Sequence, residues 1–363
     1  MKVIIAGGGT GGHLFPAVAV GEELKRQRPG CAVLYVGASD GFEARWLPQN
    51  HLDHRLFRVH GVLGHGLLGA VRSLAEFVRA LFGARRLVAD FAPDLAVSAG
   101  GYASAAVALA ALTKRVPLVL MEQNTRPGLS NRILWRFARR ICVGFPSAAS
   151  SFAPGKAVVT GNPVRFEPRG EPLRSVGDHL QIIVLGGSSG AHRLNLGVLK
   201  AFGILGKHVI KFAVVHQTGE ADRDLVSAGY AALGLSAQVL PFIDNVSEAL
   251  ERAELVIARA GAVTVSEVAL AARAAIFVPY PFHRDRQQEH NAGVLERRGA
   301  ALIVRDDENL GENLARAIAE LAAKPSRIIE MGVKAREEAR PGAAARIAQV
   351  CLQIVEEPEP KVG

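Results

Sequence analysis

The sequence predicts an α/β protein made of two doubly wound domains, each with a parallel sheet covered by helices on both faces. Its length of 363 residues suits two hydrophobic cores better than one. Runs that are apolar throughout alternate with helical patterns in both halves, as expected of parallel strands buried on both faces. Each half also opens with a β-branched run followed by a glycine-rich turn, GGGTGGH at residues 7–13 and GGSSGA at residues 186–191.

The expected strands follow from these apolar runs. In the first half they are residues 3–6, 33–36, 95–97, 118–121 and 141–143, and in the second half residues 182–185, 212–215, 255–257, 276–278 and 302–304. The domain boundary is expected near Gly161-Asn162-Pro163-Val164-Arg165, just before the Pro-rich and charged residues 166–178, and we take the domains as residues 1–161 and 162–341.

Composition limits the class of protein. Hydrophobic residues make up 49% and charged residues 21% of the chain, which is typical of a globular protein. The three cysteines are far apart and match no metal-ligand spacing, so we expect buried thiols in a reducing compartment. No secretory signal is expected at the N-terminus, and the uncharged residues 95–113 are interpreted as strand, turn and buried helix rather than a membrane span. We expect no metal and no cofactor.

The charge is concentrated in the first half. Residues 1–161 carry 19 Lys and Arg against 9 Asp and Glu, a net charge of +10, whereas the remaining residues carry 24 against 25, a net charge of −1. Such an excess indicates an anionic partner. Because no aromatic-interleaved basic stripe or nucleic-acid motif is present, we expect an acidic membrane surface and no nucleic acid.

Residues 67–88 have the pattern of an amphipathic helix. An apolar stripe of Leu67, Val71, Leu74, Val78 and Leu81 is widened by Leu68, Phe77 and Phe82, and Arg72, Arg79 and Arg86 share another face. The helix either simply covers the sheet or docks on a bilayer that contains anionic lipid. Membrane contacts in the second case would come from Leu67, Leu68, Arg72, Phe77, Arg79 and Phe82.

The first glycine turn formally satisfies the dinucleotide fingerprint, but the second strand lacks an acidic residue at its end, which argues against NAD. His13 directly follows this turn and could accept a proton from an attacking hydroxyl, or merely cap or pack. A second turn at residues 98–104 (SAGGYAS) could complete a cradle for a diphosphate.

Polar side chains also follow three expected strands, at the edge where open α/β sheets bind ligands. They are Glu122-Gln123-Asn124, the segment at residues 260–267 that ends in Glu267, and residues 285–291. Glu267 could accept hydrogen bonds from sugar hydroxyls or could simply favour the start of a helix.

Together these motifs resemble the MurG family of bacterial cell-wall N-acetylglucosaminyltransferases. The matching signatures span nearly the whole chain in order: GGGTGGH (7–13), AGGYAS (99–104), EQN (122–124), GNPVR (161–165), GGSSGA (186–191), FID (242–244), RAGAVTVSE (259–267) and DRQQ with Asn291. The resemblance implies a GT-B fold, in which two Rossmann-like domains face each other across a cleft. It also implies an inverting transfer of GlcNAc from UDP-GlcNAc to the C4 hydroxyl of MurNAc in undecaprenyl-pyrophosphoryl-MurNAc-pentapeptide (lipid I), giving lipid II.

The resemblance also implies roles for individual residues. The donor UDP-GlcNAc would contact Thr10, Gly11, Gly12, Asn124, Arg165, Ser188, Ile243, Ala262, Val263, Thr264, Val265, Ser266, Glu267, Gln287 and Gln288. The acceptor diphosphate would lie at Gly9, Gly100, Gly101 and Tyr102, with His13 as the candidate general base. A helix near residues 342–357 would pack back on the first domain. The protein would be peripheral at the cytoplasmic face of the plasma membrane, with other cell-wall synthesis and division proteins as partners.

The sequence departs from the family pattern at several positions. Met121 stands where a histidine commonly precedes Glu-Gln-Asn, Ala105-Ala106 replaces Gly-Pro, and Ala258 and Ala260 replace serines. These changes weaken the acceptor assignments more than the donor assignments. Two alternatives stay open: another GT-B nucleotide-sugar enzyme such as a UDP-GlcNAc 2-epimerase, and a membrane-docked nucleotide-sugar binding protein without turnover.

Overall fold

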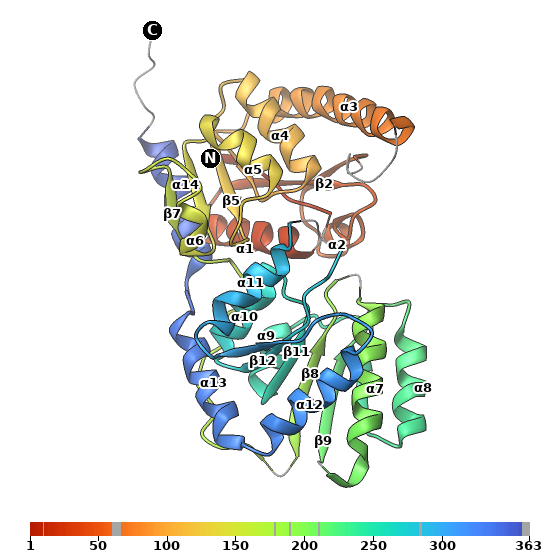
Figure 1. Cartoon of the computed structure of the whole chain (residues 1–363). Coiled ribbons are helices and arrows are strands. Elements are labelled where there is room, and N and C mark those ends of the chain that lie inside the picture. Colours follow the sequence, from red (N-terminus) through yellow and green to blue (C-terminus); the bar gives the residue numbers. More distant parts are fainter. Residues whose placement is uncertain are drawn as a thin grey trace. The chain divides into compact units, whose positions relative to one another are not determined.

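A computed structural model describes residues 1–9, 11–59, 67–177, 179–188, 190–209, 211–282 and 285–357, without the side chains of residues 67–71 and 207–209. The chain forms two compact units. The first comprises Met1–Arg165 together with the chain from Gly342 on, and the second comprises Phe166–Pro341 (Figure 1). The division falls after Arg165, four residues beyond the position expected from the sequence.

The first unit contains a parallel sheet with the strand order β3-β2-β1-β4-β5-β6-β7. The strands are β1 (Lys2–Ala6), β2 (Ala32–Ala38), β3 (His54–Phe57), β4 (Leu95–Ser98), β5 (Leu118–Glu122), β6 (Arg140–Val143) and β7 (Ala157–Val159). The helices are α1 (Gly11–Gln27), α2 (Glu43–Gln49), α3 (Leu67–Phe91), α4 (Tyr102–Thr113), α5 (Leu129–Leu134), the 3₁₀ turn η1 (Trp135–Phe137), α6 (Pro146–Ala149) and α14 (Ala343–Glu356).

The second unit contains a parallel sheet with the strand order β10-β9-β8-β11-β12-β13. Its strands are β8 (Leu180–Leu185), β9 (Phe212–Gln217), β10 (Ala237–Leu240), β11 (Leu255–Ala258), β12 (Ala274–Phe277) and β13 (Ala301–Ile303). Its helices are α7 (His192–Val209), α8 (Arg223–Leu233), α9 (Val246–Arg252), α10 (Ala262–Ala271), α11 (Gln287–Glu296), α12 (Leu310–Ala322) and α13 (Pro325–Glu337). The prediction of two doubly wound α/β domains is confirmed.

The first sheet is covered on both faces, and strand β1 shows this directly. Val3 and Ile5 pack into one cluster with residues of α1 and α14, whereas the alternate residues Ile4 and Ala6 pack into another with residues of α3 and α4. Successive side chains of a strand point to opposite faces, so an uninterrupted apolar run is what such a central strand requires.

Helix α14 completes the core of the first unit, although it comes from the other end of the chain. Ile347, Ala348 and Cys351 are buried in the same cluster as the residues of α1. The Arg346 guanidinium donates to the Thr160 carbonyl through Nε at 3.0 Å and Nη2 at 2.6 Å. All three cysteines are buried free thiols.

Helix α3 buries a narrow face of mostly small residues, with Ala80, Ala84 and Val88 against the sheet. Leu81, Leu87 and Phe91 pack, partly buried, against the same side of the sheet, so the helix covers the sheet as the simpler interpretation expects. Leu74, Val78 and Phe82 of the predicted stripe do not take part, since their exposed fractions are 58%, 41% and 66%.

Phe77 differs from the exposed row on α3. It packs, partly buried, against the cluster that contains Ala80 and Ala103, which leaves only part of its ring for the membrane contact expected from the sequence. Because an α-helix turns by about 100° per residue, Phe77 points in a different direction from its neighbour Val78, which belongs to the exposed row. No helix in the described ranges is both long and apolar enough to cross a bilayer.

Candidate functional site

The two glycine turns of the first unit touch each other because β1 and β4 are neighbouring parallel strands. A Cβ atom on Gly101 would lie 2.6 Å from the Gly8 carbonyl oxygen, and one on Gly7 would lie 2.9 Å from the Ala99 Cβ. Gly9 and Gly101 have φ angles of +94° and +92°, which other residues rarely adopt. No described residue lies within 4 Å of a Cβ built on Gly9, so the described part of this turn leaves space for a ligand.

The first turn is held from below by Glu43, which sequence reasoning missed. Its buried carboxylate Oε1 accepts the backbone N–H of Gly9 at 2.8 Å and that of Ala38 at 2.7 Å. The carboxylate fits because Gly8, Gly37 and Gly41 surround it; a Cβ on any of them would lie within 2.5 Å of Glu43. The sequence feature that could have identified Glu43 is a glutamate at the start of α2 that lies close to several glycines.

His13 lies where these turns meet. A Cβ on Gly100 would lie 3.0 Å from His13 Cε1 and 3.1 Å from Nδ1, so the half-buried imidazole packs flat against the second turn. Its Nδ1 makes no hydrogen bond with the described residues. Burial lowers the pKa of His13, and the charge of Glu122 opposes this only in part. A neutral imidazole at neutral pH is the form that accepts a proton.

Glu122 shapes the Glu-Gln-Asn segment and is fully engaged in doing so. Its Oε1 accepts Asn124 N and Nδ2 at 2.9 and 3.2 Å, and its Oε2 accepts Gly128 N at 2.9 Å and Asn131 Nδ2 at 2.8 Å. Gln123 Nε2 in turn donates to the Ala99 carbonyl at 3.0 Å, which ties this segment to the second glycine turn. We therefore assign Glu122 an organising role rather than that of a proton acceptor.

The glycine turn of the second unit has an equivalent support. Gln217, at the end of the neighbouring strand β9, accepts Gly187 N at 3.1 Å and donates to Gly187 O at 2.8 Å. Gly187 has a φ of +87°, and a Cβ on it would meet no described residue within 4 Å, whereas a Cβ on Gly190 would overlap the Thr218 carbonyl. Ser188 is half-buried in this turn.

The segment at residues 262–267 lies at the same edge of the second sheet as this turn, because β8 and β11 are neighbours. It forms the start of α10, where the first backbone N–H groups of a helix are available to an anion. Glu267 is half-buried, and its side-chain carboxyl makes no hydrogen bond with the described residues. Burial raises the pKa of Glu267 to about 7.

Helix α11 brings the two predicted glutamines to this edge. Gln288 Oε1 accepts Ala260 N at 3.1 Å and Tyr280 N at 2.9 Å, which leaves its amide N–H groups for a ligand. Gln287 precedes it and is half-buried. Ile243 is buried, and its backbone N–H and carbonyl make no hydrogen bond with the described residues.

Other predicted donor residues belong to the first unit. Gly11 and Gly12 begin α1, and Asn124 follows β5. The Arg165 guanidinium stacks over the Trp46 ring at 4.8 Å. Tyr102, which was predicted for the acceptor diphosphate, begins α4 and has an exposed fraction of 38%. Thr10 lies outside the described residues.

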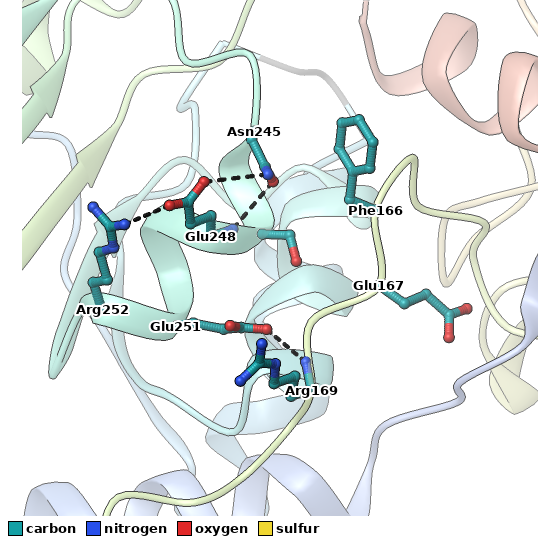
Figure 2. A pocket seen from close by; sticks show the side chains of 8 residues that line it. Phe166, Glu167, Arg169, Asn245, Glu248, Glu251 and Arg252 are labelled. Carbon is teal, nitrogen blue, oxygen red and sulfur yellow. Dashed lines mark hydrogen bonds and ion pairs between the residues drawn. The ribbon is translucent and has the colours of Figure 1, made fainter.

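A separate open cavity of about 580 Å³ lies in the second unit, between the extended Phe166–Arg169 stretch and α9 (Figure 2). Its wall includes charges that already pair: Glu251 Oε1 accepts Arg169 N at 2.6 Å, and Glu248 pairs with Arg252 at 2.5 Å. None of the predicted site residues lines it. Across the described ranges, no group of three His, Cys, Asp or Glu is arranged to hold a metal ion.

Comparison with known proteins gives consistent matches. Residues 3–143 match the glycosyltransferase family 28 N-terminal domain, and residues 181–347 match the corresponding C-terminal domain. Proteins named UDP-N-acetylglucosamine–N-acetylmuramyl-(pentapeptide) pyrophosphoryl-undecaprenol N-acetylglucosamine transferase are similar over almost their whole length. The one from Syntrophotalea carbinolica is 40% identical over 98% of this chain and 99% of its own. The one from Myxococcus xanthus is 39% identical over 98% and 93%.

Solved structures agree with these matches. Acinetobacter baumannii MurG superposes with a TM-score of 0.76 at 32% identity, covering 97% of this chain and 99% of its own. A putative UDP-N-acetylglucosamine 2-epimerase from Listeria monocytogenes has a TM-score of 0.69 at 14% identity, covering 99% of this chain and 97% of its own. The second likeness shows the fold alone.

The contact between the two glycine turns predicts a specific sensitivity to substitution. Gly101→Ala should lower the free energy of unfolding by about 1–3 kcal/mol more than Gly30→Ala, because only the first adds a backbone overlap. Gly30 is a matched control: its φ is +83°, but its Cβ would meet nothing within 4 Å. Urea unfolding of both variants measures the difference, and equal losses would contradict the contact.

Proposed function

We propose, because this chain belongs to the MurG family, that it transfers GlcNAc from UDP-GlcNAc to the C4 hydroxyl of MurNAc in lipid I and so forms lipid II. Among the structural observations, the one that supports this most directly is the donor edge of the second unit. There the turn at residues 186–191 and the segment at residues 262–267 follow adjacent strands and can serve one sugar nucleotide.

The donor would be bound mainly by the second unit. Ser188 and the start of α10 face the diphosphate in this proposal, the carboxylate of Glu267 accepts the ribose hydroxyls, and the Ile243 backbone receives the uracil. Gln287 and the free amide of Gln288 donate to the GlcNAc. Arg165, Asn124 and the start of α1 are assigned to the donor by resemblance.

The acceptor diphosphate would be cradled in the first unit by Gly9, Gly100 and Gly101, with Tyr102 beside it. The space that the described residues leave at Gly9 and the positive φ angles of these glycines suit close approach of phosphate oxygens to backbone N–H groups.

In the reaction, the MurNAc C4 oxygen attacks the anomeric carbon of GlcNAc as the bond to the UDP oxygen breaks, which inverts the configuration. His13 takes the proton of the hydroxyl, since it is neutral and its Nδ1 has no partner among the described residues. The negative charge that develops on UDP is stabilised by the helix start of α10.

We further propose that the first unit docks on anionic lipid at the cytoplasmic face of the plasma membrane. The exposed row Leu74, Val78 and Phe82 on α3 is flanked by exposed Arg72 and Arg79. The side chains of Leu67 and Leu68 lie outside the described part of this helix. Partners among other cell-wall synthesis and division proteins also stay a proposal by resemblance.

A second row with the same spacing supports membrane docking. Leu129, Ile133 and Phe137 on α5 and η1 have exposed fractions of 58%, 57% and 60%. Residues 95–161 carry eight Lys and Arg against a single acidic residue, the buried Glu122. Apolar side chains in a segment with an excess of cations suit an interfacial contact with anionic lipid.

The activity is tested with labelled UDP-GlcNAc and a soluble lipid I analogue. We expect acceptor-dependent UDP release and a disaccharide product, whereas a 2-epimerase would act on UDP-GlcNAc without an acceptor. His13→Ala should lower kcat by about 10²–10⁴-fold, the usual contribution of a general base, with little change in the KM for the donor. Undiminished turnover in this variant would remove His13 from the mechanism.

The pKa of Glu267 predicts how donor affinity depends on pH. Below a pKa of about 7 the carboxyl is protonated and binds two ribose hydroxyls less well, so ionisation as the pH rises should favour binding. We expect the KM for UDP-GlcNAc to fall about tenfold from pH 6 to pH 8, following the ionised fraction. Glu267→Gln should have a higher and nearly flat KM, and an unchanged slope in this variant would contradict the assignment.

Membrane docking is tested by sedimentation with phosphatidylglycerol vesicles, with phosphatidylcholine vesicles for comparison. Binding should require the anionic lipid, weaken with salt, and fall about tenfold in Phe82→Ser, because each buried ring contributes through its apolar area. Ile204→Ser in the second unit removes a side chain that is 54% exposed and should leave binding unchanged. Equal binding by all three proteins would rule out α3 as the docking helix.

A further inference from the structure

Asp306 lies in the loop between β13 and α12, and its side chain is completely buried. Its two carboxylate oxygens accept from two different arginines: Oδ1 accepts Arg193 Nε at 2.6 Å, and Oδ2 accepts Arg259 Nη2 at 2.7 Å. The Asp306 backbone carbonyl also accepts Arg193 Nη2 at 3.2 Å. One buried carboxylate therefore joins two cations.

The two arginines lie directly beside the two segments proposed to bind the donor. Arg193 is the second residue of α7, directly after the turn at residues 186–191. Arg259 directly follows β11 and precedes the start of α10 at Ala262 by three residues. Asp306 follows β13, and its carboxylate thus links the segments that follow β8 and β11.

Arg259 extends this linkage to β12. Its Nη1 donates to the Val278 carbonyl at 3.0 Å and contacts that of Pro279 at 3.4 Å, immediately beyond the strand. The Arg259 side chain is 9% exposed, so these two carbonyl contacts and the ion pair with Asp306 fix the position of its guanidinium. Arg193, by contrast, is 48% exposed.

A buried ion pair is weak evidence of stabilisation, because desolvation of the charges offsets their attraction. The cluster is better understood through geometry: a planar guanidinium held by a carboxylate has a defined orientation, and here two of them share one acceptor. Two arginines on one carboxylate also leave the cluster with one excess positive charge.

We propose that Asp306 is a positioning residue of the donor site, which holds Arg193 and Arg259 so that the glycine turn and the start of α10 keep the spacing that one nucleotide diphosphate requires. This inference rests on the proposed function. It makes a prediction opposite to that of simple electrostatics. Asp306→Asn removes a negative charge near an anion site and would tighten anion binding by charge alone, whereas loss of positioning weakens it.

The experiment compares the full-length chain with Asp306→Asn and with Glu308→Gln, an exposed acidic residue two positions away. UDP affinity is measured by calorimetry, and KM and kcat are measured in the transfer assay. In Asp306→Asn we expect the Kd for UDP and the KM for UDP-GlcNAc to rise about tenfold or more, with a smaller change in kcat. Glu308→Gln should match the unaltered chain.

Two further measurements separate positioning from folding. Arg193→Met alters a half-exposed residue and leaves Asp306 paired with Arg259, so it should fold with a smaller loss of Tm than Asp306→Asn and still weaken UDP binding. In the double variant Arg193→Met/Asp306→Asn the two effects should not add, since both act through one contact. If Asp306→Asn does not fold, the affinity and Tm of Arg193→Met decide the question.

Unchanged or tighter UDP binding in Asp306→Asn would overturn the inference, as would unchanged UDP binding in Arg193→Met. These results differ from failure of the proposed function. If the unaltered chain itself neither binds UDP nor transfers GlcNAc, the function is wrong; if it does both and the variants match it, only the positioning role is wrong.

Discussion

The central constraint in this protein is that each glycine turn must stay open at the end of a parallel strand, with its N–H groups available to an anion. An unsupported glycine turn has many conformations, and ordering it on binding costs free energy. In both units, one buried side chain at or beyond the end of the neighbouring strand holds the glycine turn in place by hydrogen bonds. Glu43 accepts the Gly9 N–H in the first unit, and Gln217 holds Gly187 through both of its backbone groups in the second.

The same principle separates organising carboxylates from reactive ones. Glu43, Glu122 and Asp306 are buried and accept hydrogen bonds from two or more donors. His13 and Glu267 are instead half-buried, and His13 Nδ1 and the Glu267 carboxyl have no partners among the described residues. Burial lowers the pKa of His13 and raises that of Glu267, so it favours the neutral form of both groups. Carboxylates that accept hydrogen bonds from several donors hold the site in shape, even though Glu43 Oε2 has no partner among the described residues. Half-buried groups without such donors can exchange protons or accept a ligand.

The central strands were predictable because a strand buried on both faces must be apolar throughout. The edge strands β3, β7 and β10 were missed, since each is only partly buried; β3 and β10 mix polar with apolar residues, and β7 is only three residues long. For helix α3 the element was predicted correctly, but its buried face was not. Its periodicity identified a helix, but the small residues Ala80 and Ala84 face the sheet while Leu74 and Phe82 face outward. Close packing of the helix on the sheet favours the smaller side chains, and periodicity alone cannot show which face is buried.

By itself the sequence determined the two doubly wound halves, the positions of the glycine turns and the polar segments after the strands. These depend on local patterns of apolarity and on backbone conformations that only glycine tolerates. Only the tertiary structure decided which turns touch, that Glu43 and Gln217 support them, and that Asp306 joins two arginines from distant segments. Strand order brings those residues together across 34, 30, 113 and 47 positions of chain, a separation that no local pattern encodes.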